Sequence, residues 1–154
     1  MRSTTITSIA FGTAAMLAIA CSKTPANRAP EGAAARQSSS PSVAIVDRDW
    51  ALATLRDSAA PLGAGGKPAT IRFDSAASRA SGFAGCNRYS ATYTMTGDSL
   101  HFGPAISTKM ACAQGDALER AFLAIIPEVT TFHATDSTLT LAGSSGPLAS
   151  FRSQ

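Results

Sequence analysis

A run of alternating side chains between residues 89 and 95 limits the fold of this chain more than any other feature. The apolar members are Tyr89, Ala91, Tyr93 and Met95, and the polar members between them are Ser90, Thr92 and Thr94. Successive side chains of a β-strand point to opposite faces, so this period predicts a strand with one buried face. TGDS at 96–99 is typical of a hairpin turn, and Leu100 and Phe102 begin a return strand. We therefore expect an antiparallel hairpin here.

Short strand-like segments, separated by turn residues, flank this hairpin. We expect these further strands at 43–46, 50–55, 69–73, 81–84, 129–133, 138–141 and 148–152. Trp50 and Leu52 share one face of their segment, and Ile71 and Phe73 share one face of theirs. Both pairs are predicted to point into a core.

Residues 116–126 are the exception, because their apolar side chains follow helical spacing. These side chains are Leu118, Ala121, Phe122 and Ile125. Asp116 and Glu119 have the spacing of a capping box, and Pro127 ends the helix. Many short antiparallel strands with one late helix predict a mainly β domain (β-rich α+β). We expect a small antiparallel barrel-like or sandwich fold that uses the helix as a plug or lid.

The N-terminal residues predict export. Arg2, followed by a mostly apolar stretch up to Ala20, is typical of a signal peptide at 1–20, and the stretch is too short and too polar for a transmembrane helix. LAIAC, which ends at Cys21, resembles a bacterial lipobox. The resemblance implies cleavage before Cys21 and a lipid on its sulfur. The alternative is an ordinary signal peptide cleaved near Ala20, with Cys21 incidental.

Residues 21–45 are rich in Pro, Ala and Ser, which predicts a flexible tether, and 46–154 form the expected folded domain. By resemblance to the sorting rules of Gram-negative lipoproteins, Ser22 favours the outer membrane. We therefore expect a monomer in the bacterial cell envelope, anchored through the lipid on Cys21 and facing the periplasm.

Cys86 and Cys112 are the two cysteines of the expected domain, an even number in an oxidising compartment. A disulfide between them would close a loop of about 26 residues and contribute about 3–4 kcal/mol. Two alternatives stay open. A nucleophilic Cys86 would need His101 or His133 as general base, and a metal site from the same four residues would lack the close ligand spacing of structural zinc sites. We expect the disulfide, with no metal, no cofactor and no catalytic residue.

Other function classes lack their signatures. The formal net charge of +3 comes with scattered Lys and Arg residues and no basic run, which argues against nucleic-acid binding. GSSG at 143–146 is no nucleophile elbow. GAGGKP at 63–68 has glycines and a lysine, but not in the order of a phosphate-binding loop. We therefore expect neither a serine hydrolase nor a nucleotide-binding protein.

GFAGCNRY at 82–89 has the composition of a tight connection between two strands. Asn87 tolerates a left-handed backbone and caps turns with its side chain. Arg88 either pairs with Asp74 or Asp98 or lies free on the surface. The predicted structural residues of the motif are Gly82, Gly85, Asn87 and Tyr89.

Three motifs, taken together, resemble the META domain family. They are GxxGCNxY at 82–89, STKMAC at 107–112 and LTL at 139–141. The family includes the HslJ-like heat-inducible envelope protein and a protozoan virulence-associated protein, and the resemblance covers about 49–151. It implies a small β-rich fold with one helix, and it makes Cys86 and Cys112 neighbours. It also implies a part in stress response, antibiotic tolerance, and motility or secretion, and it supplies no catalytic residue.

These observations lead to one expectation of function and one alternative. We expect a non-enzymatic envelope lipoprotein whose domain binds an unknown protein or a small apolar ligand, or acts as a stress-protective module. The alternative is an enzyme that uses Cys86 as nucleophile with His101 or His133.

The lipid anchor gives the first testable prediction. After expression in a bacterial host, mass spectrometry of the mature N-terminus is expected to find Cys21 as the first residue, carrying diacylglycerol and an acyl group. A soluble product with an unmodified N-terminus would show that Cys21 is incidental.

Overall fold

The computed structural model describes residues 45–154. The predictions for the signal peptide at 1–20, for Cys21 and for the tether up to residue 44 therefore lie outside the described residues. Ile45, which the sequence placed in the tether, is fully buried. Its carbonyl accepts a hydrogen bond of 3.1 Å from the indole nitrogen of Trp50. The folded domain therefore already includes this residue.

Strands dominate the described part of the chain. They are β1 (Asp49–Leu55), β2 (Ser58–Ala59), β3 (Thr70–Asp74), β4 (Arg79–Phe83), β5 (Arg88–Thr96), β6 (Ser99–Phe102), β7 (Ile106–Ser107), β8 (Thr131–Ala134), β9 (Thr138–Gly143) and β10 (Gly146–Ser153). The helix α1 (Asp116–Ile125) follows β7, and the short 3₁₀ turns are η2 (Ala64–Gly66) and η3 (Ile126–Glu128). No helix among these residues is long and apolar enough to cross a membrane.

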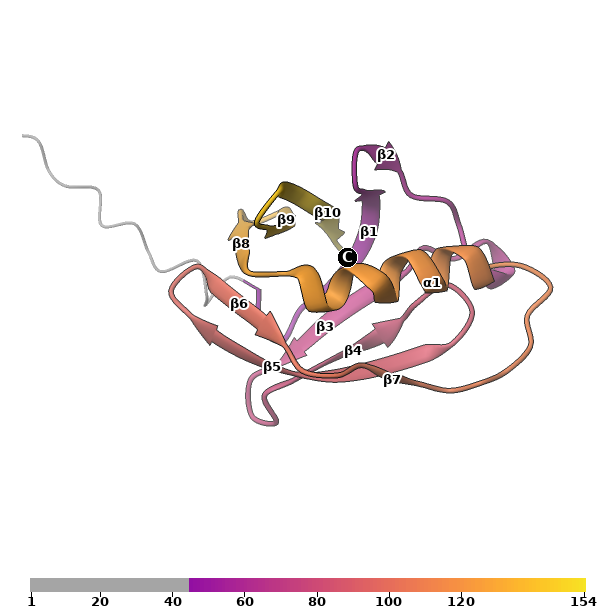
Figure 1. Ribbon diagram of the computed structural model, residues 1–154, viewed down its shortest axis with the longest axis horizontal. Coiled ribbons are helices and arrows are strands. Elements are labelled where there is room, and N and C mark those ends of the chain that lie inside the picture. Colours follow the sequence, from indigo (N-terminus) through magenta and orange to yellow (C-terminus); the bar gives the residue numbers. More distant parts are fainter. Residues whose placement is uncertain (1–44) are drawn as a thin grey trace, which may run out of the picture. The chain divides into compact units, whose positions relative to one another are not determined.

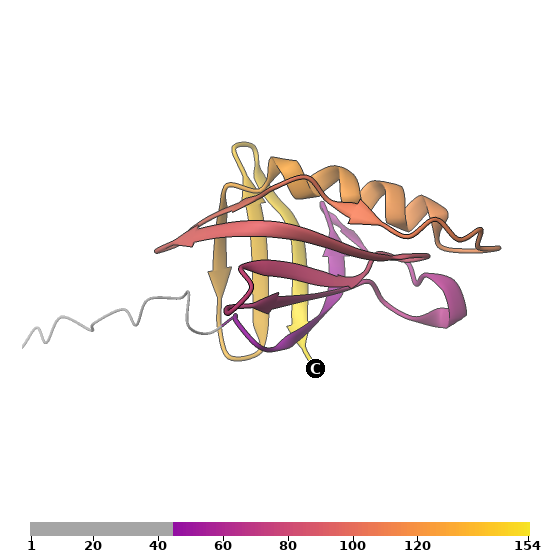
Figure 2. The ribbon, with the colours of Figure 1, turned by 90° about the horizontal axis from the view of Figure 1, so that it is seen from below.

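Eight strands form a closed antiparallel barrel, in the order β1, β3, β4, β5, β6, β8, β9, β10 and back to β1. The first and last strands close it, with Trp50 opposite Ser153 and Leu52 opposite Phe151. β2 and β7 lie outside the ring, paired with β1 and β5. Figures 1 and 2 show the ring and its single helix. The predicted mainly β fold is confirmed as a barrel rather than a sandwich.

The period of two explains which side chains enter the barrel. Tyr89, Ala91 and Tyr93 are buried on β5, and the residues between them face outward. Ile71 and Phe73 are buried on β3 in the same way. The predicted inward sets are thus confirmed, because a strand in a closed barrel has one face in the core and one in solvent.

The helix α1 covers one end of this barrel with its apolar face (Figure 2). Leu118, Phe122 and Ile125 are its buried residues, as their spacing predicted. The Phe122 ring packs edge-on against Tyr89 at 5.3 Å and against Phe151 at 6.3 Å between centroids. The helix therefore plugs the barrel with aromatic contacts.

The predicted capping box is wrong. The residue before the helix, Gly115, has a φ of 99° and makes no side-chain cap, and Asp116 lies inside the first turn. The carboxylate of Glu119 instead accepts a 2.6 Å hydrogen bond from the backbone nitrogen of Asn87, on a different segment. The Glu119 carboxylate thus bonds to a distant segment instead of to a backbone nitrogen at the start of its own helix, as a capping box requires.

Three glycines from distant segments pack backbone against backbone at one end of the barrel. A Cβ atom on Gly63 or on Gly115 would overlap the carbonyl oxygen of Gly85. That same oxygen accepts a 2.7 Å hydrogen bond from the backbone nitrogen of Ala64. Only glycine permits this approach, so the three loops meet as one unit.

This contact gives a stability prediction. Gly63→Ala is expected to lower the free energy of unfolding by about 3 kcal/mol, because two backbones must separate to admit the methyl group. Gly66→Ala is the control. Its φ of 68° is strained for alanine, but nothing lies within 4 Å of the added atom, so its loss should be about 1–2 kcal/mol. Urea unfolding measures both, and an equal or reversed order would contradict the glycine contact.

Candidate functional site

The barrel interior is filled by side chains. Trp50, Phe73, Phe122 and Phe151 are among its largest fully buried residues. Phe73 contacts the Tyr93 ring edge-on at 5.3 Å between centroids, so aromatic packing extends from the helix toward the opposite side of the core. Large aromatic side chains thus make up much of the described core.

The disulfide expected between Cys86 and Cys112 is present, with 5.9 Å between the two Cα atoms. The sulfur of Cys86 is therefore not a free thiol. His101 and His133 are exposed on β6 and β8. The carboxylate that lies close to the two sulfurs is that of Asp116, and it forms with them the one potential metal-ligand group found among the described residues. Both sulfurs of that group are already bonded to each other, so it offers no thiolates.

Asn87 is the buried polar residue of the described core, with 5% of its surface exposed, and it connects three segments. Its side-chain oxygen accepts hydrogen bonds from the backbone nitrogen of Met110 at 2.8 Å and from the hydroxyl of Thr108 at 3.0 Å. Its side-chain nitrogen lies 3.3 Å from the carbonyl of Met110 and 3.3 Å from the carboxylate of Glu119. The buried amide is thus satisfied on both sides.

Asn87 does not adopt the left-handed backbone that asparagine tolerates. The positive φ in this turn, 126°, belongs to Gly85, and Asn87 is not among the residues with positive φ. The amide is used for long-range contacts instead of for capping a local turn. Asn87 therefore holds the turn to the loop before α1.

Tyr89 has a structural role as well. Its hydroxyl donates a 3.2 Å hydrogen bond to the carbonyl of Thr70. Complete burial raises the pKa of the Tyr89 phenol far above its usual value, because the charged phenolate would lose its hydration. The group is therefore a neutral donor at physiological pH and not an acid–base catalyst.

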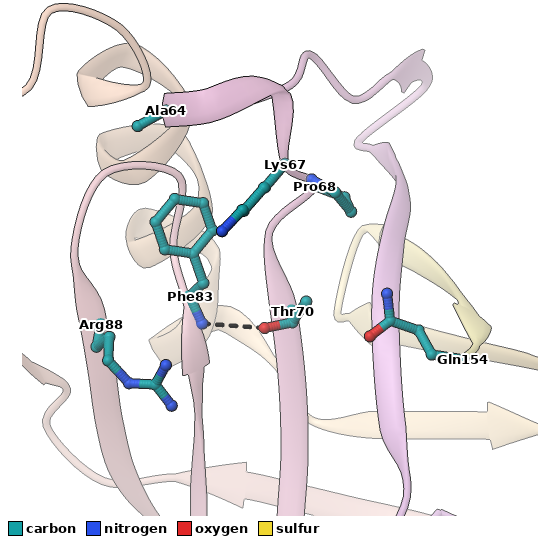
Figure 3. A pocket seen from close by; sticks show the side chains of 7 residues that line it. All are labelled: Ala64, Lys67, Pro68, Thr70, Phe83, Arg88 and Gln154. Carbon is teal, nitrogen blue, oxygen red and sulfur yellow. Dashed lines mark hydrogen bonds between the residues drawn. The ribbon is translucent and has the colours of Figure 1, made fainter.

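A pocket of about 360 Å³ lies on the outside of the barrel, over β3, β4 and the start of β5 (Figure 3). Its lining residues are Ala64, Lys67, Pro68, Thr70, Phe83, Arg88 and Gln154. Phe83 and Arg88 are cross-strand partners, which places their side chains next to each other on one face. The backbone nitrogen of Phe83 donates to the hydroxyl of Thr70 at 3.0 Å, which fixes the strand beneath the ring.

Two cations, Lys67 and Arg88, line the pocket together with Phe83, and the lining contains no acidic residue; the Lys67 amine lies beside the ring in Figure 3. Lys67 and Arg88 are both exposed, and the ion pairs of the described residues, Arg56–Glu128 and Arg72–Asp49, include neither. Arg88 thus lies on the surface, without the considered pairing to an aspartate. The two positive groups stand out because acidic and basic residues are equal in number from Ile45 onward. The pocket combines an aromatic wall with unpaired positive charge.

The profile of the META domain family matches residues 43–154. The chain belongs to the META domain family. It is 28% identical to a protein from Burkholderia xenovorans whose structure was determined by NMR, with a TM-score of 0.59 over 74% of this chain and 88% of that one. A second NMR structure is 21% identical, with a TM-score of 0.53 over 68% of this chain and 87% of that one, and shows the likeness of fold alone. No curated protein matches the chain.

In this META domain, the pocket could not be recognised from the sequence. Lys67 stood out only because GAGGKP resembles a phosphate-binding loop in composition, and Arg88 only as a partner for an aspartate. Phe83 lies three residues from Cys86 without a signal of its own. The alternation of inward and outward side chains along each strand does predict that Phe83 and Arg88 face outward. Their position next to each other depends on strand register, which the sequence does not show.

The Asn87 contacts predict a specific coupling. Asn87→Asp is expected to lower the free energy of unfolding by about 2–4 kcal/mol, because a carboxylate would replace the N–H donor that faces Met110 and Glu119. Adding Glu119→Gln should recover at least half of that loss, since its amide can donate to the new carboxylate. Denaturant unfolding of both single variants and the double variant measures the coupling. Strict additivity would contradict the direct contact.

Proposed function

We propose that this protein is a non-enzymatic, lipid-anchored binding protein of the bacterial cell envelope. Its META domain would bind a small amphipathic anion, with an apolar body and a phosphate or carboxylate group, in the pocket between Lys67 and Arg88. The observation that carries the proposal is that two cations outside the ion pairs of the described residues line one pocket with the Phe83 ring.

The chemistry of the lining supports this ligand class. Phe83, Pro68 and Ala64 provide apolar surface, and an apolar pocket with a few placed polar groups is typical of small-molecule sites. Arginine offers a fork of donors to an oxyanion, and lysine a compact charge. An uncharged apolar ligand would leave both cations unused, so an anionic group fits better than the purely apolar ligand expected from the sequence.

A binding role also agrees with the absence of an assembled catalytic group among the described residues. Cys86 is bonded to Cys112, and Tyr89 is a buried neutral donor. Lipidation of Cys21 would place the domain on the envelope, most simply on the periplasmic side of the outer membrane, where this disulfide can persist.

The test uses three soluble probes of equal chain length. Octyl phosphate and octanoate are expected to bind to residues 43–154 in calorimetry, and octyl glucoside is expected not to bind. Lys67→Gln combined with Arg88→Gln should weaken octyl phosphate binding at least tenfold, or about 1.4 kcal/mol, because charge-assisted hydrogen bonds are lost. This fragment is suitable because its barrel is closed by β1 and β10 and contains the whole described core.

A matched control removes the same charge elsewhere. Arg120 and Arg152 are exposed and lie outside the pocket lining, so Arg120→Gln combined with Arg152→Gln should leave binding unchanged. Equal loss in both double variants would mean that only net charge matters. Failure of all probes, together with suppressed aggregation of an unfolded client protein, would replace binding by a stress-protective role.

A further inference from the structure

Three large apolar side chains of the described domain are exposed, and each lies in a segment that is connected to the turn around Arg88. Leu62, Ile106 and Met110 are 60%, 68% and 65% exposed. Leu62 lies two residues before Ala64, which lines the pocket with Lys67 and Arg88. Ile106 lines a second depression together with Arg88, and the backbone of Met110 is bonded to Asn87, the neighbour of Arg88. Exposed apolar side chains that lie together, rather than singly, are typical of an interaction surface.

Strand register puts part of this cluster on one outer face. Phe83 is paired with Arg88 across β4 and β5, and Ser90 is paired with Ile106 across β5 and β7. Arg88 and Ser90 are two residues apart on β5, so their side chains point to the same side. Phe83, Arg88 and Ile106 therefore share one outward surface.

The two remaining apolar residues extend that surface from well-anchored loops. Leu62 precedes Gly63, which packs against Gly85, and both backbone polar groups of Met110 are bonded to the Asn87 side chain. Figure 2 shows the loop around η2 and the loop before α1 at the same end of the barrel. Their exposure is thus held by specific contacts of the fold.

The charges around the cluster favour an anionic partner. Lys67, Arg88 and Lys109 are exposed there. Two acids on α1 also lie near this surface, Glu119 beside Asn87 and Asp116 beside the disulfide, so the three cations outnumber the acids by one. Apolar side chains surrounded by cations are the combination that binds anionic lipid surfaces.

We propose that this surface docks the domain on a bilayer that contains anionic phospholipid. Leu62, Ile106 and Met110 enter the interface, and Lys67 and Arg88 receive a lipid phosphate. This inference rests on the proposed function, because it names the bilayer as the source of the amphipathic anion. If residues 22–44 form the flexible tether expected from the sequence, the root-mean-square distance between its ends would be about 30 Å. An anchored domain would therefore stay within reach of its own membrane.

The test is co-sedimentation of residues 43–154, which lack the acyl anchor, with vesicles. Vesicles of phosphatidylcholine with phosphatidylglycerol are expected to bind the domain, and pure phosphatidylcholine vesicles are expected to bind at least tenfold less. Leu62→Ser combined with Met110→Ser should reduce binding to the anionic vesicles about tenfold. The conservative pair Leu62→Met with Met110→Leu should keep it. Circular dichroism and absence of free thiols check that each variant is folded.

The two proposals fail in different ways. If octyl phosphate binds through Lys67 and Arg88 while anionic vesicles do not bind, the pocket stands and the membrane surface is wrong. If vesicles bind equally well after Leu62→Ser with Met110→Ser, the apolar contact is wrong. If vesicles bind through the apolar residues and octyl phosphate does not bind, the surface stands and the pocket does not hold the headgroup. Loss of vesicle binding in the Lys67→Gln, Arg88→Gln variant but not in the Arg120→Gln, Arg152→Gln control supports headgroup capture.

Discussion

The buried amide of Asn87 is the interaction on which the arrangement of this domain most depends. A buried polar side chain destabilises a fold unless its hydrogen bonds are made. Here the amide makes them to the loop at Met110 and Thr108, and to Glu119 on the helix. The turn between β4 and β5, the loop before α1 and the helix itself therefore cannot move independently without exposing or orphaning that amide.

The covalent and steric constraints next to Asn87 act on the same segments. The Cys86–Cys112 disulfide joins the turn to the loop, and the contacts of Gly85 with Gly63 and Gly115 bring two further backbones into van der Waals range. These three kinds of constraint meet at one end of the barrel, where a long loop would otherwise be free to fluctuate. Because the disulfide, the glycine contacts and the Asn87 hydrogen bonds all involve the turn at 82–89, this motif has a structural role: it joins three segments.

The contacts of this turn also fix the outer face of the barrel on which Phe83 and Arg88 lie. Large aromatic side chains occupy the barrel interior, and the pocket with Lys67 and Arg88 lies on the outer face. Arg88 follows Asn87 directly, is exposed, and lies beside its cross-strand partner Phe83. A well-anchored backbone allows exposed apolar and charged groups to be presented with little loss of order on binding. Stability and the proposed recognition are thus products of the same contacts.

The sequence by itself determined the eight strands of the barrel and their buried faces, where the helix lies and which family the chain belongs to, but not the short strands β2 and β7. Those features depend on local periodicity and on motifs such as GxxGCNxY, which need no knowledge of distant residues. Only the tertiary structure decided that β1 closes on β10, that Glu119 bonds to Asn87 rather than capping its own helix, and that Lys67, Arg88 and Phe83 line one pocket. The physical reason is the same in each case: the partners are far apart in the chain, and strand register and loop contacts, which leave no local pattern, bring them together.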